Sequence, residues 1–303
     1  MKLYKRIVIA VALLGICTSQ LHSQVEIMLR KSFIDSVKNR ITYDGQMHIV
    51  KAHKKPNPPS KDGDMHVAGT IGSVGLPVVM EIMNAKGEKK AVDIVHANEG
   101  TANLIPVKGV WRLWCEHAGS EYVQNQGEGF PEIVNSNPDH VFELHPATEI
   151  NNIDLIKSLK PITGYEYKEA QDAFSRYSNT RCKLKDLGDK IKIETTGVGY
   201  NYVEFWIEII DDNQFVVDDG RFVFCKVLDK DGELICTKVR MAFPKDSKAE
   251  KAVKKLKRGD TMHVLGIPRI DLALVSYRVE NASKNSEMLE WNLPFEMTVV
   301  AKF

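Results

Sequence analysis

Hydrophobic and polar residues alternate along most of this chain, and the alternation predicts a protein built mainly from β-strands. The clearest run is DHVFELHP, near the middle of the sequence. Phe142 and Leu144 fall on one face of a strand there, while Glu143 and His145 fall on the other. Pro146 cannot donate a ladder hydrogen bond, so we expect it to end the strand. A carboxylate and an imidazole therefore share one strand face.

Similar alternation predicts further strands in the first half of the chain. They cover 46–50, 65–69, 77–84 and 104–116. Gly109 lies inside the last run and predicts a bulge or bend, as strands need when a small sheet closes on itself. The spacing of apolar residues over 25–40 predicts a helix. The polar segment 118–138 predicts a long surface loop.

The second half follows a polar stretch at 151–161 that suits a domain boundary. Helices are predicted over 166–182 and over the lysine-rich 247–257, the latter capped by Asp246 or Ser247. Strands are predicted at 190–195, 203–210, 221–228, 234–243, 261–267, 273–279 and 295–303. About three strands, a helix and two more strands is the element order of the five-stranded oligonucleotide/oligosaccharide-binding (OB) barrel.

We therefore expect a mainly β fold with a few helices, a β-rich α+β protein made of two small OB-like β-barrel domains. The first domain would span 24–158 and the second 159–303. The run GVWRLWCEH of the first would correspond to LGIPRIDLALVSY of the second. A weak internal duplication is a further hypothesis.

The first residues, 1–23, predict a secretory signal peptide. A positively charged start precedes the apolar run 7–16, which is too short to span a bilayer. The protein is therefore expected in the periplasm or secreted, with no transmembrane segment after signal removal. Lipid attachment at Cys17 is less favoured, because Ile16 is bulkier than the small residue such a site needs.

The charge balance limits the possible binding partners, and the cysteines limit the possible disulfides. The chain has 41 Lys and Arg against 40 Asp and Glu, so net charge does not support nucleic-acid binding, which would need a local patch. Cys225 and Cys236 flank the DKDG turn symmetrically. A two-residue loop would place them opposite each other, which permits a disulfide, and two buried thiols are the alternative.

Histidine is concentrated in the first predicted domain, which contains seven of the nine histidines. Asp64-x-His66 and Glu143-x-His145 each place an acid and an imidazole on one strand face, about 7 Å apart. These are ligand types of transition-metal sites. A divalent metal (Zn, Mn or Ca) is the cofactor hypothesis, and ordinary polar strand faces are the alternative. The predicted ligands are Asp64, His66, Glu143, His145 and His117.

Three other side chains, those of Arg112, Glu81 and Trp114, complete the predicted site. Arg112 suits an anionic oxygen, and Glu81 lies on a neighbouring predicted strand. Trp111 and Trp114 cannot share a strand face, so we expect Trp111 in the core and Trp114 on the surface beside Arg112. An exposed indole there suits stacking on a base or sugar ring. The alternative is that both indoles cover one end of the barrel.

The leading functional hypothesis is an exported two-domain binding protein that presents an acid, His, Arg and Trp surface to an anionic polymer or glycan. The alternative is a metal-dependent, nuclease-like phosphodiester hydrolase on the same surface, with Arg112 and Glu81 as catalytic residues. Whether the protein is an enzyme stays open. The sequence contains no Gly-rich phosphate loop, G-x-S-x-G or H-E-x-x-H motif.

The motifs DGDMH, GVWR and ELHP occur in this order, with Glu81 between the first two. The succession resembles a group of exported bacterial proteins that carry DGDxH early and E-[LI]-H-P at a later strand end. It covers roughly residues 45–150, and Ala147 stands where valine is usual. The resemblance implies no activity. It groups Asp64, His66, Glu143 and His145 as one set.

Overall fold

The computed structural model describes residues 24–119, 123–282 and 289–303. The predicted signal peptide and Cys17 lie outside these residues. Within them, no helix is long and apolar enough to cross a membrane.

Strands dominate the described chain. They are β1 (Gln24–Arg30), β2 (Thr42–Ala52), β3 (Met65–Ile71), β4 (Pro77–Ile82), β5 (Leu104–Leu113), β6 (Gln124–Asn125), β7 (Phe142–Ile150), β8 (Ile153–Asp154), β9 (Lys168–Glu169), β10 (Arg181–Asp186), β11 (Lys190–Thr196), β12 (Val203–Ile209), β13 (Phe215–Val217), β14 (Gly220–Leu228), β15 (Leu234–Pro244), β16 (Thr261–Ile270), β17 (Leu289–Asn292) and β18 (Phe295–Lys302). The helices are α1 (Lys31–Val37), α2 (Lys89–Asn98), α3 (Ala170–Asn179), α4 (Lys248–Val253) and α5 (Leu272–Glu280), with 3-10 turns η1 (Pro59–Lys61), η2 (Ala85–Gly87) and η3 (Ile156–Ser158).

Two closed barrels confirm the predicted fold class. The first has the order β4-β3-β2-β5-β7 and closes where β4 pairs in parallel with β7. The second has the order β14-β15-β18-β16-β12 and closes where β12 pairs with β14. In each barrel the third and fifth strands are parallel, and a helix, α2 or α4, follows the third strand. Both are OB folds by strand order.

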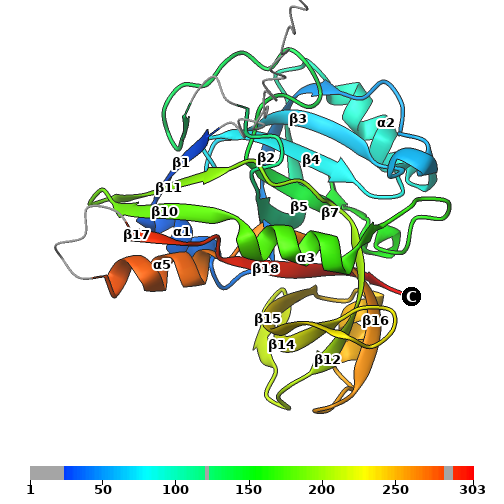
Figure 1. Ribbon diagram of the computed structural model, residues 1–303. Coiled ribbons are helices and arrows are strands. Elements are labelled where there is room, and N and C mark those ends of the chain that lie inside the picture. Colours follow the sequence, from blue (N-terminus) through cyan, green and yellow to red (C-terminus); the bar gives the residue numbers. More distant parts are fainter. Residues whose placement is uncertain (1–23, 120–122, 283–288) are drawn as a thin grey trace, which may run out of the picture.

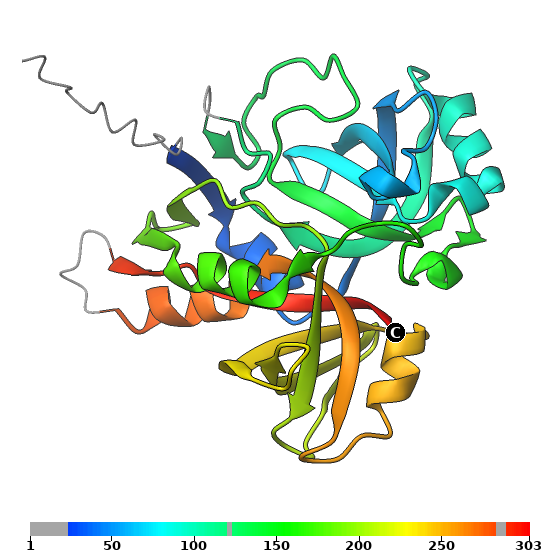
Figure 2. The same ribbon diagram turned by 45° about the vertical axis from the view of Figure 1, so that its right-hand side comes forward.

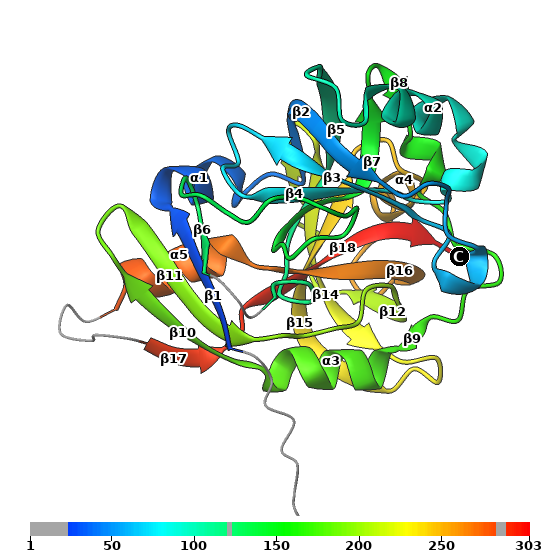
Figure 3. The ribbon, with the colours of Figure 1, turned by 90° about the horizontal axis from the view of Figure 1, so that it is seen from above.

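A third sheet, ordered β17-β10-β11-β1-β6, lies beside the barrels. Figure 1 shows it at the left, with the first barrel at the upper right and the second below. The barrels stay one above the other in Figure 2, and Figure 3 shows the third sheet and α5 projecting to one side of both. Since β1 pairs with β11, this sheet joins residues from both sides of the predicted domain boundary, which itself stays a prediction.

Three predictions about elements are wrong. Pro146 does not end its strand, because β7 continues to Ile150 and Pro146 lies at the bulge beside Gly109, where the regular pairing is interrupted. The helix expected over 25–40 is β1 followed by α1, because Val25, Ile27 and Leu29 alternate with more exposed residues and β1 pairs along its whole length with β11. The strand expected at 273–279 is helix α5, which Asp271 caps by accepting a hydrogen bond from the Leu274 amide at 2.9 Å.

The disulfide between Cys225 and Cys236, which the sequence left open beside two buried thiols, does not form. The hairpin between β14 and β15 has a loop of residues 229–233 instead of two residues, and a bulge follows Cys225. The register therefore places Cys225 opposite Val239 and Cys236 opposite Val227, and the cysteines of the described chain are free thiols. The alternative of a buried thiol holds for Cys225, whereas Cys236 is partly exposed.

Glycine bends the fourth strand of each barrel. The predicted bulge at Gly109 is present, and a Cβ there would lie 2.8 Å from the Leu144 Cβ. A register shift also occurs at Gly266, where a Cβ would lie 2.9 Å from the Phe205 ring. Larger residues would clash at both positions, so both glycines are needed for the close approach of neighbouring strands.

The matching bulges belong to an internal repeat. GVWRL (109–113) on β5 corresponds to GIPRI (266–270) on β16, and FEL (142–144) on β7 corresponds to FEM (295–297) on β18. The register pairs Arg112 with Glu143 and Arg269 with Glu296. The suspected duplication therefore has a residue-level pattern.

Contacts between the barrels are reciprocal. Arg112 Nε donates to the Pro268 carbonyl and Arg269 Nη1 donates to the Trp111 carbonyl, each at 3.0 Å. Each arginine thus donates a hydrogen bond to the carbonyl of the residue that precedes the other arginine in the chain. A similar exchange links Tyr202 Oη to Asp64 at 2.6 Å and Thr42 Oγ1 to Asp219 at 2.9 Å. The two barrels are joined by a pseudo-two-fold set of buried hydrogen bonds.

We expect Arg269→Met to lower the free energy of unfolding by about 3–5 kcal/mol, because it removes the hydrogen bond to Glu296 Oε1 and leaves that buried carboxylate with Arg240 as its remaining cationic neighbour, at 3.2 Å. Arg269→Met combined with Glu296→Leu should recover most of this loss. Urea unfolding measures both, and Lys89→Met, in an exposed ion pair with Asp93, serves as the control with a change below about 1 kcal/mol. Equal losses in the single and double variants would contradict the role of the pair.

Candidate functional site

The two acid-x-His pairs are brought together by a strand between them. β3 and β7 are not adjacent, since β4 lies between them in the barrel. The β3–β4 register pairs His66 with Glu81, and the β4–β7 register places Glu81 beside His145. Glu81 therefore connects the two pairs.

The resulting cluster has the spacing of a metal site. His145 Nε2 lies 3.6 Å from Asp64 Oδ2, and His145 Nδ1 lies 3.3 Å from Glu81 Oε2. One ligand atom each from Asp64, Glu81 and His145 lies within 4.8 Å of the other two, so this triad can hold a metal ion. His66 Nε2 lies 3.5 Å from Glu81 Oε2 at the edge of the triad.

Two predicted ligands lie beside the triad. Glu143 accepts a hydrogen bond from Arg112 Nη1 at 2.7 Å and lies 3.2 Å from His140 Nε2 and 3.3 Å from His145 Nδ1. These contacts suit a residue that orients the His145 ring. His117 stacks on His140, with ring centroids 5.4 Å apart. The roles predicted for these residues stay predictions.

Burial and neighbouring charges shift the pKa values of the cluster. Burial raises the pKa of Asp64 well above its usual range, although His145 and Tyr202 oppose the shift. Burial acts the same way on Glu81, but His145 and His66 outweigh it and lower the pKa of Glu81 to about 2. Burial acts to lower the pKa of His66, yet Glu81 raises it to about 9. The cluster therefore contains ionised groups away from water.

Some polar atoms in the cluster have no hydrogen-bond partner. They are Asp64 Oδ1, Glu81 Oε2 and His66 Nδ1. Glu81 Oε2 lies near two imidazoles but in hydrogen-bonding geometry with neither. Most buried polar groups in proteins are paired, so this cluster can accept a further positive partner.

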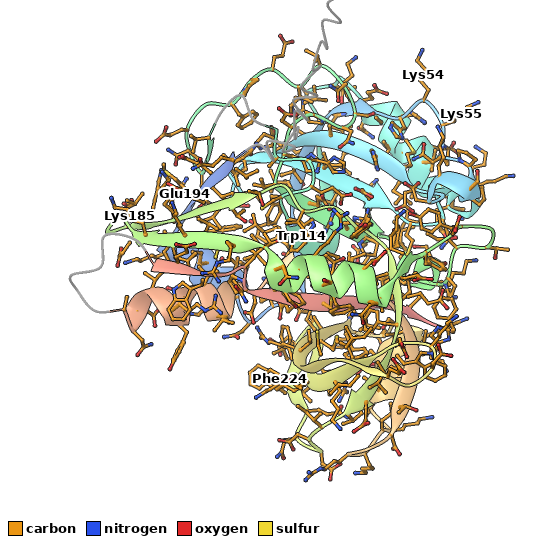
Figure 4. All side chains as sticks on the ribbon, in the orientation of Figure 1. Lys54, Lys55, Trp114, Lys185, Glu194 and Phe224 are labelled. Carbon is orange, nitrogen blue, oxygen red and sulfur yellow. The ribbon has the colours of Figure 1, made fainter. Side chains whose placement is uncertain are left out.

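The predicted surface of acid, His, Arg and Trp residues is not a surface. The exposed fraction is 0% for Arg112 and 1% for both Trp114 and Glu143. The Trp114 ring packs edge-on against Tyr177 of α3, with centroids 5.4 Å apart, and Figure 4 labels Trp114 in the middle of the molecule, just above α3. The prediction that Trp111 lies in the core is confirmed, and the exposure predicted for Trp114 is wrong because α3 covers it.

Two members of the cluster were missed from the sequence. Tyr202 comes from the second barrel, donates its hydroxyl to Asp64 and lies 2.9 Å from His145 Nε2. No local pattern marks it. His140 could have been found, since it stands three residues before Glu143 in the DHVFELHP run.

The second barrel retains only part of this arrangement. By strand register, Asp64, His66, Glu81 and His145 correspond to Gly220, Phe222, Ala242 and Thr298. The buried Arg–Glu pair occurs in both barrels. The pair is therefore a common structural feature, and the acid and histidine cluster belongs to the first barrel alone.

A concave site on the second barrel was also missed. This cleft, of about 500 Å³, lies between the chain entering α3 and the strands β12 and β16. Trp206 in the cleft stacks on His263 with centroids 4.7 Å apart, and His263 stacks on Phe303. The cleft carboxylates are those of Glu166, Glu169, Glu204 and Asp229. Aromatic rings and acids thus line one opening.

A different exposed face is formed by β14 and β15. Phe224 is 42% exposed, and Lys238 Nζ lies 4.5 Å from the centre of its ring. Figure 4 shows Phe224 projecting from the second barrel. The second and third strands of an OB barrel form its usual ligand face.

No family model and no curated protein matches this sequence. Similar solved structures include a replication protein A heterotrimer bound to ssDNA (9% identity, TM-score 0.21), with 75% of this chain and 44% of that chain covered. The single-stranded DNA binding protein from Thermus aquaticus has 10% identity and a TM-score of 0.20, with coverage of 76% and 84%. The Ifi202 HINa domain in complex with 20-bp dsDNA has 11% identity and a TM-score of 0.18, with coverage of 83% and 97%. At these scores the likeness says nothing about the ligand of this chain.

We expect Trp114→Ala to lower the free energy of unfolding by about 3–5 kcal/mol, as removal of a buried indole does. Trp291→Ala is the matched control, because that side chain is 40% exposed, and it should cost clearly less. Denaturant unfolding compares the two. If Trp114→Ala lowers the free energy of unfolding no more than Trp291→Ala does, the Trp114 side chain is exposed, as the sequence predicted.

Proposed function

We propose that this chain is an exported binding protein that holds a glycan in the cleft of its second barrel. The observation that supports the proposal is the combination of rings and carboxylates in one opening. Tyr165, Tyr167 and Trp206 contribute rings, and Glu169 and Glu204 contribute acceptors. Export rests on the predicted signal peptide.

The cleft chemistry suits a polyhydroxylated ring. The C–H face of a sugar packs on an aromatic ring, and its hydroxyl groups donate to carboxylates. Lys168 and Lys230 at the same opening can donate to sugar oxygens. A volume of about 500 Å³ is within the usual range for ligand pockets.

Charge favours a neutral glycan over an anionic polymer. Four carboxylates and two lysines line the cleft, so a polymer of negative charge would be repelled by close acids. Of the two ligand classes expected from the sequence, the glycan fits this opening better.

The acid and histidine cluster is buried, and a buried cluster does not support the hydrolase alternative. Asp64 and His145 are 0% exposed and Glu81 is 2% exposed, so a phosphodiester polymer has no path to them. A divalent metal held there would be enclosed, and its role would be structural.

Binding of the full chain to an array of neutral glucose, mannose, galactose and N-acetylglucosamine oligosaccharides tests the proposal. We expect at least one series to bind, and Trp206→Ala to weaken it about tenfold or more, because loss of a stacked ring costs about 1–3 kcal/mol. Trp291→Ala, outside the cleft, should bind as the wild type does. Failure of every series to bind, or equal binding by Trp206→Ala, would contradict a glycan cleft.

A second candidate function is the binding of single-stranded nucleic acid on the β14–β15 face. The exposed Phe224 ring beside Lys238 favours it, since bases stack on aromatic rings and lysines contact phosphate. Net charge does not favour it, because the formal value is only +1.

Fluorescence anisotropy with a labelled oligothymidine tests this second candidate. Binding should weaken about tenfold in Phe224→Ala through lost stacking, and should also weaken as salt rises. Trp206→Ala is the control, because it alters the cleft and leaves the β14–β15 face intact. Absence of binding at low salt, or equal affinity of Phe224→Ala and wild type, would exclude this face.

A further inference from the structure

We propose that Asp64, Glu81 and His145 bind a divalent transition-metal cation inside the first barrel, and that Tyr202 of the second barrel orients this site. The cation would join the two barrels at the point where Tyr202 crosses between them. This site is separate from the glycan cleft, and neither proposal depends on the other.

The donor set indicates the class of cation. Two carboxylates and an imidazole suit zinc or manganese, whereas calcium takes six to eight oxygen ligands. His66 is placed to supply a further nitrogen, because its Nε2 lies 3.5 Å from Glu81 Oε2. Zinc and manganese are therefore the probes for this site.

Unpartnered atoms provide an observation independent of the ligand spacing. Asp64 Oδ1 is buried without a hydrogen-bond partner, and Glu81 Oε2 has only long contacts, at 3.3 Å to His145 Nδ1 and 3.5 Å to His66 Nε2; the two side chains are 0% and 2% exposed. A buried carboxylate oxygen with no partner is costly. A cation between these side chains would satisfy both oxygens.

The residues around the triad have the arrangement usual for metal sites. Glu143 lies 3.3 Å from His145 Nδ1 and is itself fixed by Arg112. Tyr202 Oη donates to Asp64 Oδ2 at 2.6 Å. Carboxylates that orient a ligating histidine, and hydrogen bonds to ligating carboxylates, are typical of the surroundings of metal ligands.

The second barrel shows that the fold does not require these residues. Gly220, Ala242 and Thr298 occupy the positions of Asp64, Glu81 and His145 there. The Arg269–Glu296 pair is nevertheless intact at 2.7 Å. The triad is therefore an addition to a frame that both barrels share. Residues that the fold does not need are expected where a barrel has acquired a binding site.

Two measurements on the full chain test the proposal. The first is elemental analysis of protein purified without chelator, and the second is titration of chelator-treated protein with Zn²⁺ and Mn²⁺. We expect about one equivalent of bound metal in the wild type and at least tenfold weaker binding in Glu81→Gln. Glu250→Gln is the matched control, since it alters a buried, arginine-paired carboxylate of the second barrel and should keep the metal. Absence of binding by the wild type, or equal binding by Glu81→Gln, would overturn the site.

Two further measurements keep the proposal testable if Glu81→Gln does not fold. Spin-echo modulation spectra of the Mn²⁺-loaded wild type should contain the coupling of a histidine nitrogen, and a spectrum without it would overturn the ligand set. Tyr202→Phe should lower metal affinity by about 10–100-fold, as loss of a group that orients a ligand does. Unchanged affinity in this variant would remove the role assigned to Tyr202.

Discussion

Two buried arginines exchange hydrogen bonds across the interface between the barrels, and the rest of the architecture depends on that exchange. Each arginine pairs with a glutamate of its own barrel and donates to the backbone of the other. The Arg269 guanidinium also lies 3.7 Å from the centre of the Trp111 ring. Because β5 and β16 are held together in this way, the polar face of the first barrel is closed from solvent, and Tyr202 reaches Asp64.

The two barrels share one frame and differ in what they add to it. The bulged glycine, the arginine and the FE dipeptide recur in both. The first barrel adds an acid and histidine cluster that is enclosed, whereas the second keeps an open cleft of rings and carboxylates. An enclosed cluster suits an ion and an open cleft suits a larger ligand, so the two barrels are suited to different partners.

Local patterns were sufficient to predict most strands, the OB element order and the bulge at Gly109. They also identified Asp64, His66, Glu143 and His145 as a set, because acid and imidazole share a strand face whatever surrounds it. Burial could not be predicted, since it depends on α3 and on the second barrel. The same holds for Tyr202, whose partners are far away in the sequence. The expected pairing of Cys225 with Cys236 was wrong because one bulge and a longer loop shift the hairpin register and move Cys236 away from Cys225.

We infer that the common frame carries an enclosed cation site in the first barrel. Anomalous X-ray diffraction from crystals grown with Mn²⁺ or Zn²⁺, recorded above and below the absorption edge of the metal, tests it most directly. We expect one anomalous peak between Asp64, Glu81 and His145 and none at the corresponding position near Gly220, Ala242 and Thr298. A well-ordered triad without a peak, or a peak only at another place, would contradict it.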